Sequence, residues 1–269
     1  MNKTTFLTSI ALSAASLAHA ALVIDFNNSG DLTGNFTRTG STLWAETASG
    51  GNPSGYASVG SNFSGFNTQN STFSLDLSQD QSFTLSADIL TAFNLFPRDG
   101  YLNLSLGLTT ASSIAYAGSG NLDQVSLVAG TVSKTDNIDG STGGPTNTYG
   151  YHFGRGDTST GRQITGSSVD NLSINTWYQL ITNWTYTDST NTFAMNLVLK
   201  SADGTSTVRD LSFASGIANP WGADDTIIVH AFFGGRESYN AGISGVDNFT
   251  TPVPEPSAFA LLGGLCALG

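Results

Sequence analysis

Apolar and polar residues alternate strictly along several parts of this chain, and this alternation limits the fold more than any other feature. It is clearest in residues 73–77, 83–89 and 102–108, where every second side chain is apolar. A period of two places the apolar side chains of a segment on one face of a β-strand, so that one face is buried and the other meets water. These segments therefore predict half-buried β-strands.

Two longer alternating segments, 178–186 and 193–199, lie on either side of the turn-like sequence 188–191. The second segment is followed by Asp203-Gly204, a pair of residues that is typical of a tight turn. Together these features predict a long β-hairpin.

Residues 22–26 and 246–249 predict the first and last strands, and we expect the two to pair. Residues 227–233 are apolar on both faces except at His230, which indicates a strand buried within the domain and a hydrogen-bonded sheet histidine. Three tryptophans fall in strand patterns and are expected in the core: Trp44, Trp177 and Trp184.

The composition favours strands over helices. Charged residues make up 11% of the 269 residues, and the chain has only three Lys and three Glu, which are the residues that exposed helical faces use most. The fold class that we predict is all-β: a two-sheet antiparallel β-sandwich of jelly-roll type over residues 21–251. A net charge of −11 argues against nucleic acid as a partner.

The first twenty residues have the three parts of a secretion signal. Lys3 supplies a positive start, residues 6–17 are apolar or small, and Ala18-His19-Ala20 has the small-x-small pattern of a signal peptidase site. The apolar run is shorter than a membrane span. We predict export, with signal peptidase cleaving before Ala21.

Residues 252–269 form a separate tail. Prolines end the domain, because they remove backbone donors, and the core Pro254-Glu255-Pro256 precedes an apolar run over 257–269. This tail resembles the PEP-CTERM sorting signal. The resemblance implies exosortase as a processing partner, transient membrane association through the tail, and a cell-surface or extracellular location in a Gram-negative-type bacterium. Family members close with a basic cluster, whereas this chain stops at Gly269, so we expect a truncated or degenerate tag.

The predicted hairpin supports a second resemblance. Residues 175–180 contain Trp177 at the start of a strand, and 193–199 alternate up to the Asp203-Gly204 turn. This part is similar to the central hairpin of concanavalin A-like and laminin-G-like domains, and it implies a jelly roll of that kind. A galactose-binding-type jelly roll is the alternative fold.

Catalytic patterns are missing from the sequence. Glycoside hydrolysis needs two carboxylates beside the scissile bond, but Glu46 and Glu237 each stand alone, and the basic cluster with Tyr or His that lyases use is absent. We therefore predict a non-enzymatic protein. An atypical glycan-active hydrolase or lyase is the alternative, since folding can bring Asp pairs together.

Glycan recognition uses aromatic faces together with polar side chains that bind hydroxyls. Trp221 and Tyr239, with Arg236 close by, lie in loop-like segments, and His152 and Arg155 lie in a glycine-rich stretch that we expect to be a loop. These five residues are the binding candidates. For Trp221 the alternative is packing over a sheet edge, and for the histidine it is plain surface.

No cofactor motif is present, but a structural calcium ion is one possibility. Calcium needs several oxygen ligands close together, and Asp25 and Asp247 lie in the predicted first and last strands, where sandwich domains often bind this ion. The sequence as a whole favours an exported lectin-like β-sandwich with a role in glycan binding, adhesion or matrix structure, with polysaccharide as its partner.

Overall fold

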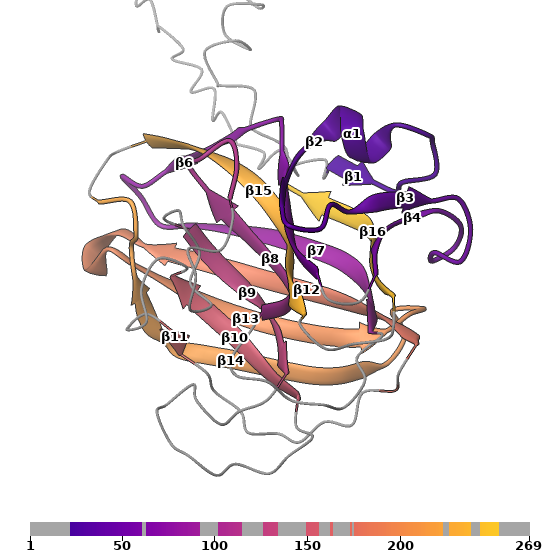
Figure 1. Cartoon of the computed structure of the whole chain (residues 1–269). Helices are drawn as coiled ribbons and strands as arrows, with labels where there is room; N and C mark the ends of the chain where they lie inside the picture. Colours follow the sequence, from indigo (N-terminus) through magenta and orange to yellow (C-terminus); the bar gives the residue numbers. More distant parts are fainter. Residues whose placement is uncertain are drawn as a thin grey trace, which may run out of the picture.

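The protein folds into two antiparallel β-sheets packed face to face, as the alternation predicted (Figure 1). The architecture is the antiparallel two-sheet β-sandwich that the sequence predicted. The computed structural model describes residues 22–60, 63–91, 102–114, 126–133, 149–155, 162–163, 173, 175–222, 226–237 and 243–252.

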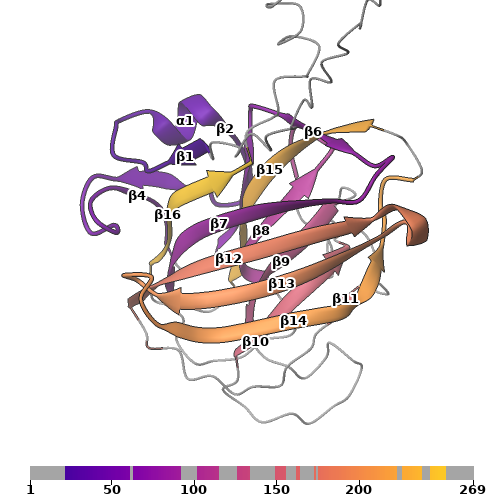
Figure 2. The same ribbon diagram turned by 180° about the vertical axis from the view of Figure 1, so that it is seen from behind.

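Sheet A faces the viewer in Figure 2. Its strand order is β14-β13-β12-β7-β16-β4-β3, with β1 paired to β16. Its four longest strands, β7, β12, β13 and β14, are neighbours. The strands are β1 (Leu22–Ile24), β3 (Ala45–Thr47), β4 (Tyr56–Val59), β7 (Gln81–Thr91), β12 (Thr176–Thr187), β13 (Thr192–Ser201), β14 (Thr207–Ala218) and β16 (Ser244–Thr251).

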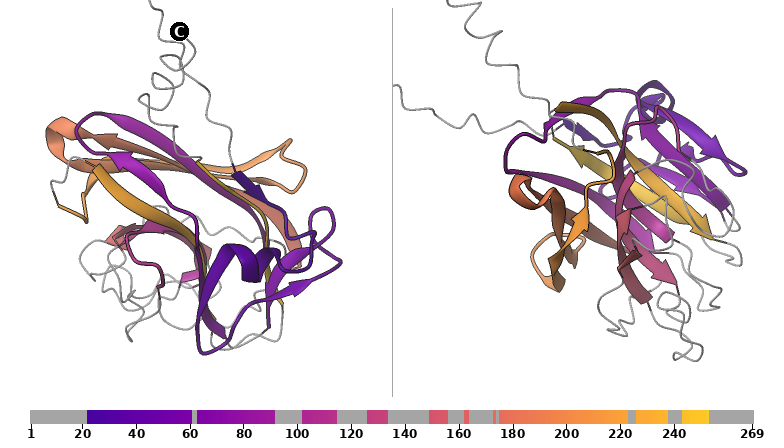
Figure 3. Two further views of the ribbon diagram at one scale, coloured as in Figure 1. Left: turned by 90° about the horizontal axis from the view of Figure 1, so that it is seen from above. Right: turned by 90° about the vertical axis from the view of Figure 1, so that its left-hand side faces the viewer.

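Sheet B has the order β11-β10-β9-β8-β15-β5-β2, with β6 paired to β15. Figure 3 shows the two layers from above. Its strands are β2 (Phe36–Gly40), β5 (Phe63–Gln69), β6 (Phe73–Asp76), β8 (Leu102–Thr109), β9 (Ser126–Ser133), β10 (Tyr149–Arg155), β11 (Arg162–Gln163) and β15 (Thr226–Glu237).

The predicted hairpin is formed by β12 and β13. Tyr186 pairs with Phe193 across the turn, the 3-10 helix η1 (Asp188–Thr190) fills the turn, and Asn191 adopts the left-handed conformation with φ 51°. Asparagine tolerates this conformation better than most residues. Every second residue of β12 from Tyr178 to Tyr186 is buried, as the period of two requires.

The first and last strands pair, as predicted. Leu22 lies opposite Thr251, and Ile24 lies opposite Phe249. Strand β16 also pairs with β7 on one side and β4 on the other. The two ends of the described chain therefore leave the sandwich side by side.

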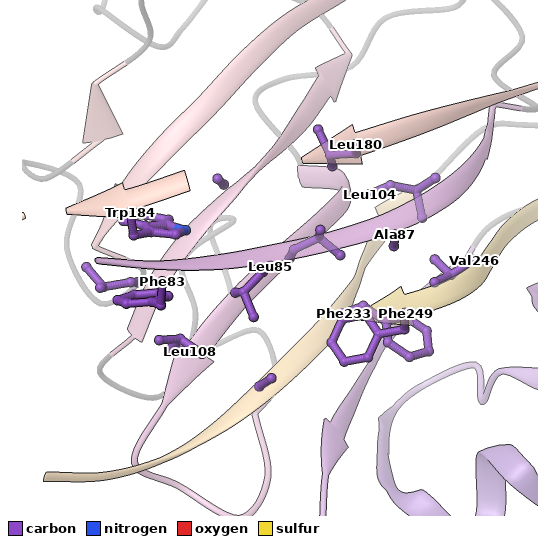
Figure 4. Close-up of a cluster of buried hydrophobic side chains, with 14 of the residues drawn as sticks. Phe83, Leu85, Ala87, Leu104, Leu108, Leu180, Trp184, Phe233, Val246 and Phe249 are labelled. Carbon is purple, nitrogen blue, oxygen red and sulfur yellow. The ribbon is translucent and has the colours of Figure 1, made fainter. Parts of the chain in front are cut away.

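The inner faces of the two sheets enclose one hydrophobic core (Figure 4). Trp184 stacks on Phe83 with ring centroids 6.2 Å apart, and Phe233 contacts Phe249 at 5.2 Å. Trp44 and Trp184 are fully buried, as predicted.

Trp177 corrects a prediction, because it lies on the outer face of sheet A and not in the core. It directly precedes the core residue Tyr178, so the alternation turns its side chain outward. The ring is half-buried, meets Tyr56 edge-on at 5.4 Å, and donates a hydrogen bond from Nε1 to the carbonyl oxygen of Gly50 at 3.1 Å.

Helix α1 (Asp31–Asn35) was not predicted from the sequence. It begins after Gly30, which has φ 98°, and the carboxylate of Glu46 accepts hydrogen bonds from the N–H groups of Gly30 and Leu32 at 2.8 and 2.5 Å. Glu46 thus provides hydrogen-bond acceptors for backbone N–H groups that have no partner within the helix. No helix within the described ranges is long and apolar enough to cross a membrane.

Candidate functional site

Three of the five binding candidates lie in sheet B. His152 and Arg155 belong to β10, where they pair with Gly130 and Leu127 of β9. The prediction of a loop here was wrong, because Gly150 and Gly154 stand at two of the alternate positions and hide the strand pattern. Arg236 lies near the end of β15, opposite Ser64 of β5.

Trp221 lies elsewhere, in the turn that follows β14. Its ring meets Phe193 of β13 edge-on at 5.9 Å and packs against the core. Its N–H donates to Oδ1 of Asn219 at 3.0 Å, whereas the buried indole Nε1 has no hydrogen-bond partner in the described part of the chain. This is the sheet-edge packing that the sequence left open.

Several predicted residues fall outside the described ranges. They are Tyr239, the cleavage residues Ala18, Ala20 and Ala21, and the tail residues Pro254, Glu255 and Pro256. The predicted signal peptide and sorting tail therefore stay predictions.

The outer face of sheet B is a floor of small residues. The register places Gly107 of β8 beside Phe232 of β15, and Ser105 beside Gly234. The rows continue into β9 and β10, so that four glycines share this face across neighbouring strands: Gly107, Gly130, Gly154 and Gly234. The same rows contain His152, so the fold brings this candidate onto the glycine floor.

Space above this floor is occupied by two aromatic rings. A Cβ atom at Gly107 would lie 2.5 Å from Cζ of Phe232, and one at Gly234 would lie 2.7 Å from Cδ1 of Phe66. Real Cβ atoms do not approach other carbon atoms so closely. Glycine is therefore required at both positions, and each phenylalanine ring rests on the backbone of the neighbouring strand.

The outer face of sheet A carries a second polar site, which we call the acid–amide cluster: Asn52, Asp88, Asp247 and Asn248. Asp88 and Asp247 are register partners on β7 and β16. Oδ2 of Asp88 accepts from Nδ2 of Asn248 at 2.7 Å and from Nδ2 of Asn52 at 3.2 Å. The backbone N–H groups of Asn52 and Asn248 donate to Oδ2 and Oδ1 of Asp247, each at 2.8 Å.

Burial controls the electrostatics of this cluster. It raises the pKa of Asp247 to about 6, an effect that the charges of Asp88 and Asp25 increase and that the two backbone N–H groups oppose. Burial also raises the pKa of Asp88. Asp247 is fully buried, so its ionised form is held at a cost in free energy.

The acid–amide cluster does not present the ligand set of a metal site. Asp25 lies just after β1 and accepts hydrogen bonds from Asn27. Among the described residues, no three His, Cys, Asp or Glu side chains gather in a way that would hold a metal ion. Both oxygens of Asp247 accept backbone N–H groups. Calcium at Asp25 and Asp247 therefore stays a prediction.

Three described carboxylates, Glu46, Asp88 and Asp247, have structural partners. Glu46 binds the start of α1, and the pair Asp88–Asp247 is buried and engaged by Asn52 and Asn248. A glycosidase pair must instead flank a groove that admits the sugar and water. No sequence pattern predicts a site at Asn52, Asp88 or Asn248. The left-handed φ of 47° at Asn248 belongs to the fold and leaves no mark in the sequence pattern.

The overall architecture is shared with plant lectins. Lectin I-B4 from Griffonia simplicifolia superposes with a TM-score of 0.53 at 11% identity, covering 86% of this chain and 98% of that one. Lectin I from Ulex europaeus, in complex with the methyl glycoside of α-L-fucose, gives 0.51 at 13% identity, with 86% and 96% covered.

A lectin from Bauhinia forficata in complex with GalNAc gives a TM-score of 0.50 at 11% identity, with 87% and 98% of the two chains covered. No protein-family model matches the chain, and no curated protein sequence matches it. At these identities the likeness establishes the fold alone, a two-sheet β-sandwich of jelly-roll, concanavalin A-like type.

Proposed function

We propose that this protein is a non-catalytic, lectin-like β-sandwich that binds carbohydrate on the outer face of sheet B. The observation that carries the proposal is the floor of glycine and aromatic residues on that face, in a fold shared with lectins that were solved with GalNAc and a fucoside. A sugar ring presents a C–H face that stacks on an aromatic ring and hydroxyls that need hydrogen-bond partners. The outer face carries the buried aromatic pair Phe66 and Phe232, and polar residues occupy positions on the neighbouring strands.

The candidates His152 and Arg236 lie on opposite sides of this floor. β10, which contains His152, is separated by β9 and β8 from β15, which contains Arg236. Polar side chains at these two positions would bind sugar hydroxyls, while Phe66 and Phe232 would supply the stacking surface. We give Trp221 a packing role, because it lies against β13 of sheet A.

An array of neutral and anionic glycans tests this proposal. We expect the purified protein to bind at least one glycan, and His152→Ala or Arg236→Ala to weaken that binding about tenfold or more, since each removes a hydrogen bond from a polar or charged group. Arg209→Ala, in β14 of sheet A, is the matched control and should bind as the wild type does. Uniformly blank arrays would favour a purely structural role.

We also propose that the chain is exported by its first twenty residues and sorted by exosortase through its tail. The sandwich supports this arrangement, because Leu22 and Thr251 are paired neighbours, so that both processing segments adjoin one edge of a finished domain. Replacing Pro254, Glu255 and Pro256 together by alanine should change processing or surface retention in an exosortase-containing host. Identical cell fractionation of the two proteins would rule out sorting by this tail.

A further inference from the structure

The outer face of sheet B is covered, although it lies outside the core between the two sheets. Phe66 and Phe232 contact each other with ring centroids 5.9 Å apart, and their exposed fractions are 1% and 0%. Neither ring belongs to the core cluster. Some other part of the chain must therefore shield these rings from water.

Residues 110–114, which we call the strap, reach across this face. The strap begins at the end of β8, and its last residue, Ile114, is 1% exposed and lies outside the core cluster. The hydroxyl of Thr39 on β2 donates a hydrogen bond to the carbonyl oxygen of Ile114. Since β15 and β5 separate β8 from β2 in the sheet, the strap crosses both strands that carry the two rings.

Two hydroxyl groups on the same face are buried without a hydrogen-bond partner in the described part of the chain. They are Oγ1 of Thr68, the register partner of Phe232, and Oγ of Ser126, the register partner of Thr109. Both residues have no exposed surface. Buried polar groups without a partner are uncommon and destabilising, so these hydroxyls are available to a polar ligand.

We propose that the strap is a gate over the glycine floor of sheet B. The strap opens to admit a neutral sugar residue between Ile114 and the rings of Phe66 and Phe232. This inference rests on the proposed function, because it concerns access to the same face. We infer a neutral sugar, because Thr39, Thr68 and Ser105, whose register positions share the face of the two rings, carry hydroxyls and no charge. Its C–H face stacks on the rings, and its hydroxyls bind Thr68 and Ser126.

A gate lowers the apparent affinity by the fraction of molecules that are open. Thr39→Val removes the hydroxyl that fastens the strap and keeps the shape of the side chain. We expect Thr39→Val to raise glycan affinity and association rate about fivefold, because this change corresponds to the usual net contribution of one hydrogen bond. The control is Thr37→Val on the same strand and face, because the hydroxyl of Thr37 bonds Oδ1 of Asn70 at 2.9 Å and not the strap.

Hydrogen exchange provides a second measurement that needs no ligand. The amide of Ala111 donates to Oγ1 of Thr109 at 3.1 Å, so its exchange reports opening of the strap. It should speed up about fivefold in Thr39→Val and stay unchanged in Thr37→Val. Melting curves of both variants verify that each is folded.

The outcomes separate the gate from the function itself. Faster exchange and tighter binding in Thr39→Val alone support the gate. Intact glycan binding with equal affinity, association rate and exchange in Thr39→Val and the wild type would overturn the gate and leave the proposed function standing. If neither variant nor the wild type binds any glycan, the proposed function fails, and the gate has no ligand to admit.

Discussion

Replacing Phe233 by alanine should lower the free energy of unfolding by about 3–5 kcal/mol, as truncation of a fully buried aromatic residue does. Phe233 is the centre of an aromatic cluster that ties both sheets to the N-terminal segment. Its ring lies within 6 Å of four other aromatic rings: Phe26, Phe36, Trp44 and Phe249. Alanine would leave a cavity that these large rings cannot fill together. Chemical denaturation at neutral pH measures the loss.

The same strand supplies the control. Ile228 on β15 is also a large apolar residue, but 54% of it is exposed, and Ile228→Ala should change the free energy of unfolding by less than about 0.5 kcal/mol. A loss below about 1 kcal/mol for Phe233→Ala would contradict a shared core between the two sheets. Equal losses for the two variants would do the same.

The second large effect is a dependence of stability on pH that comes from Asp247. Its pKa is raised to about 6 in the folded protein, from 3.8 as the ordinary value, so the folded state binds this proton more tightly than the unfolded chain does. The resulting stabilisation is fully present below pH 3.8 and is lost as the pH rises through 6. The shift corresponds to at most about 3 kcal/mol.

Other carboxylates titrate as well, so the contribution of Asp247 is the difference between the wild type and Asp247→Asn. Denaturation in calcium-free buffer should show the wild type losing up to about 3 kcal/mol relative to Asp247→Asn between pH 4 and 7. Asp203→Asn is the control: hydrogen bonds from Ser201 and Thr205 lower the pKa of Asp203, so this variant should stay parallel to the wild type over that range.

Parallel curves for the wild type and Asp247→Asn would contradict this account of the acid–amide cluster. Adding calcium at pH 7 tests the metal prediction in the same experiment. An ion bound by Asp25 and Asp247 would stabilise the wild type and leave Asp247→Asn unchanged.

The sequence predicted those elements whose side chains follow one simple period. The hairpin of β12 and β13 and the paired end strands β1 and β16 were found in this way. Strand β10 was missed because glycines replace its polar residues, so that Tyr149, Tyr151 and Phe153 do not stand out from a loop-like composition. Helix α1 was missed because five residues are too few to show a helical period.

The candidate sites depend on register, which no local pattern reveals. Asp88 and Asn248 lie 160 residues apart in the chain and join in one cluster only because β7 and β16 are neighbours. The strap is similar, since the contact between Thr39 and Ile114 spans 75 residues. Trp177 shows how a shift of one residue changes the face, because its neighbour Tyr178 is in the core.

We expect carbohydrate to bind on the outer face of sheet B. The most direct test is an NMR titration of the isotope-labelled protein with the glycan that binds best on the array, which follows the backbone amides of the glycines on that face. We predict that the signals of Gly107, Gly130, Gly154 and Gly234 shift together on binding, whereas those of Gly204 and Gly216, which lie with sheet A, stay in place. Shifts confined to sheet A, or none at saturating glycan, would contradict the claim.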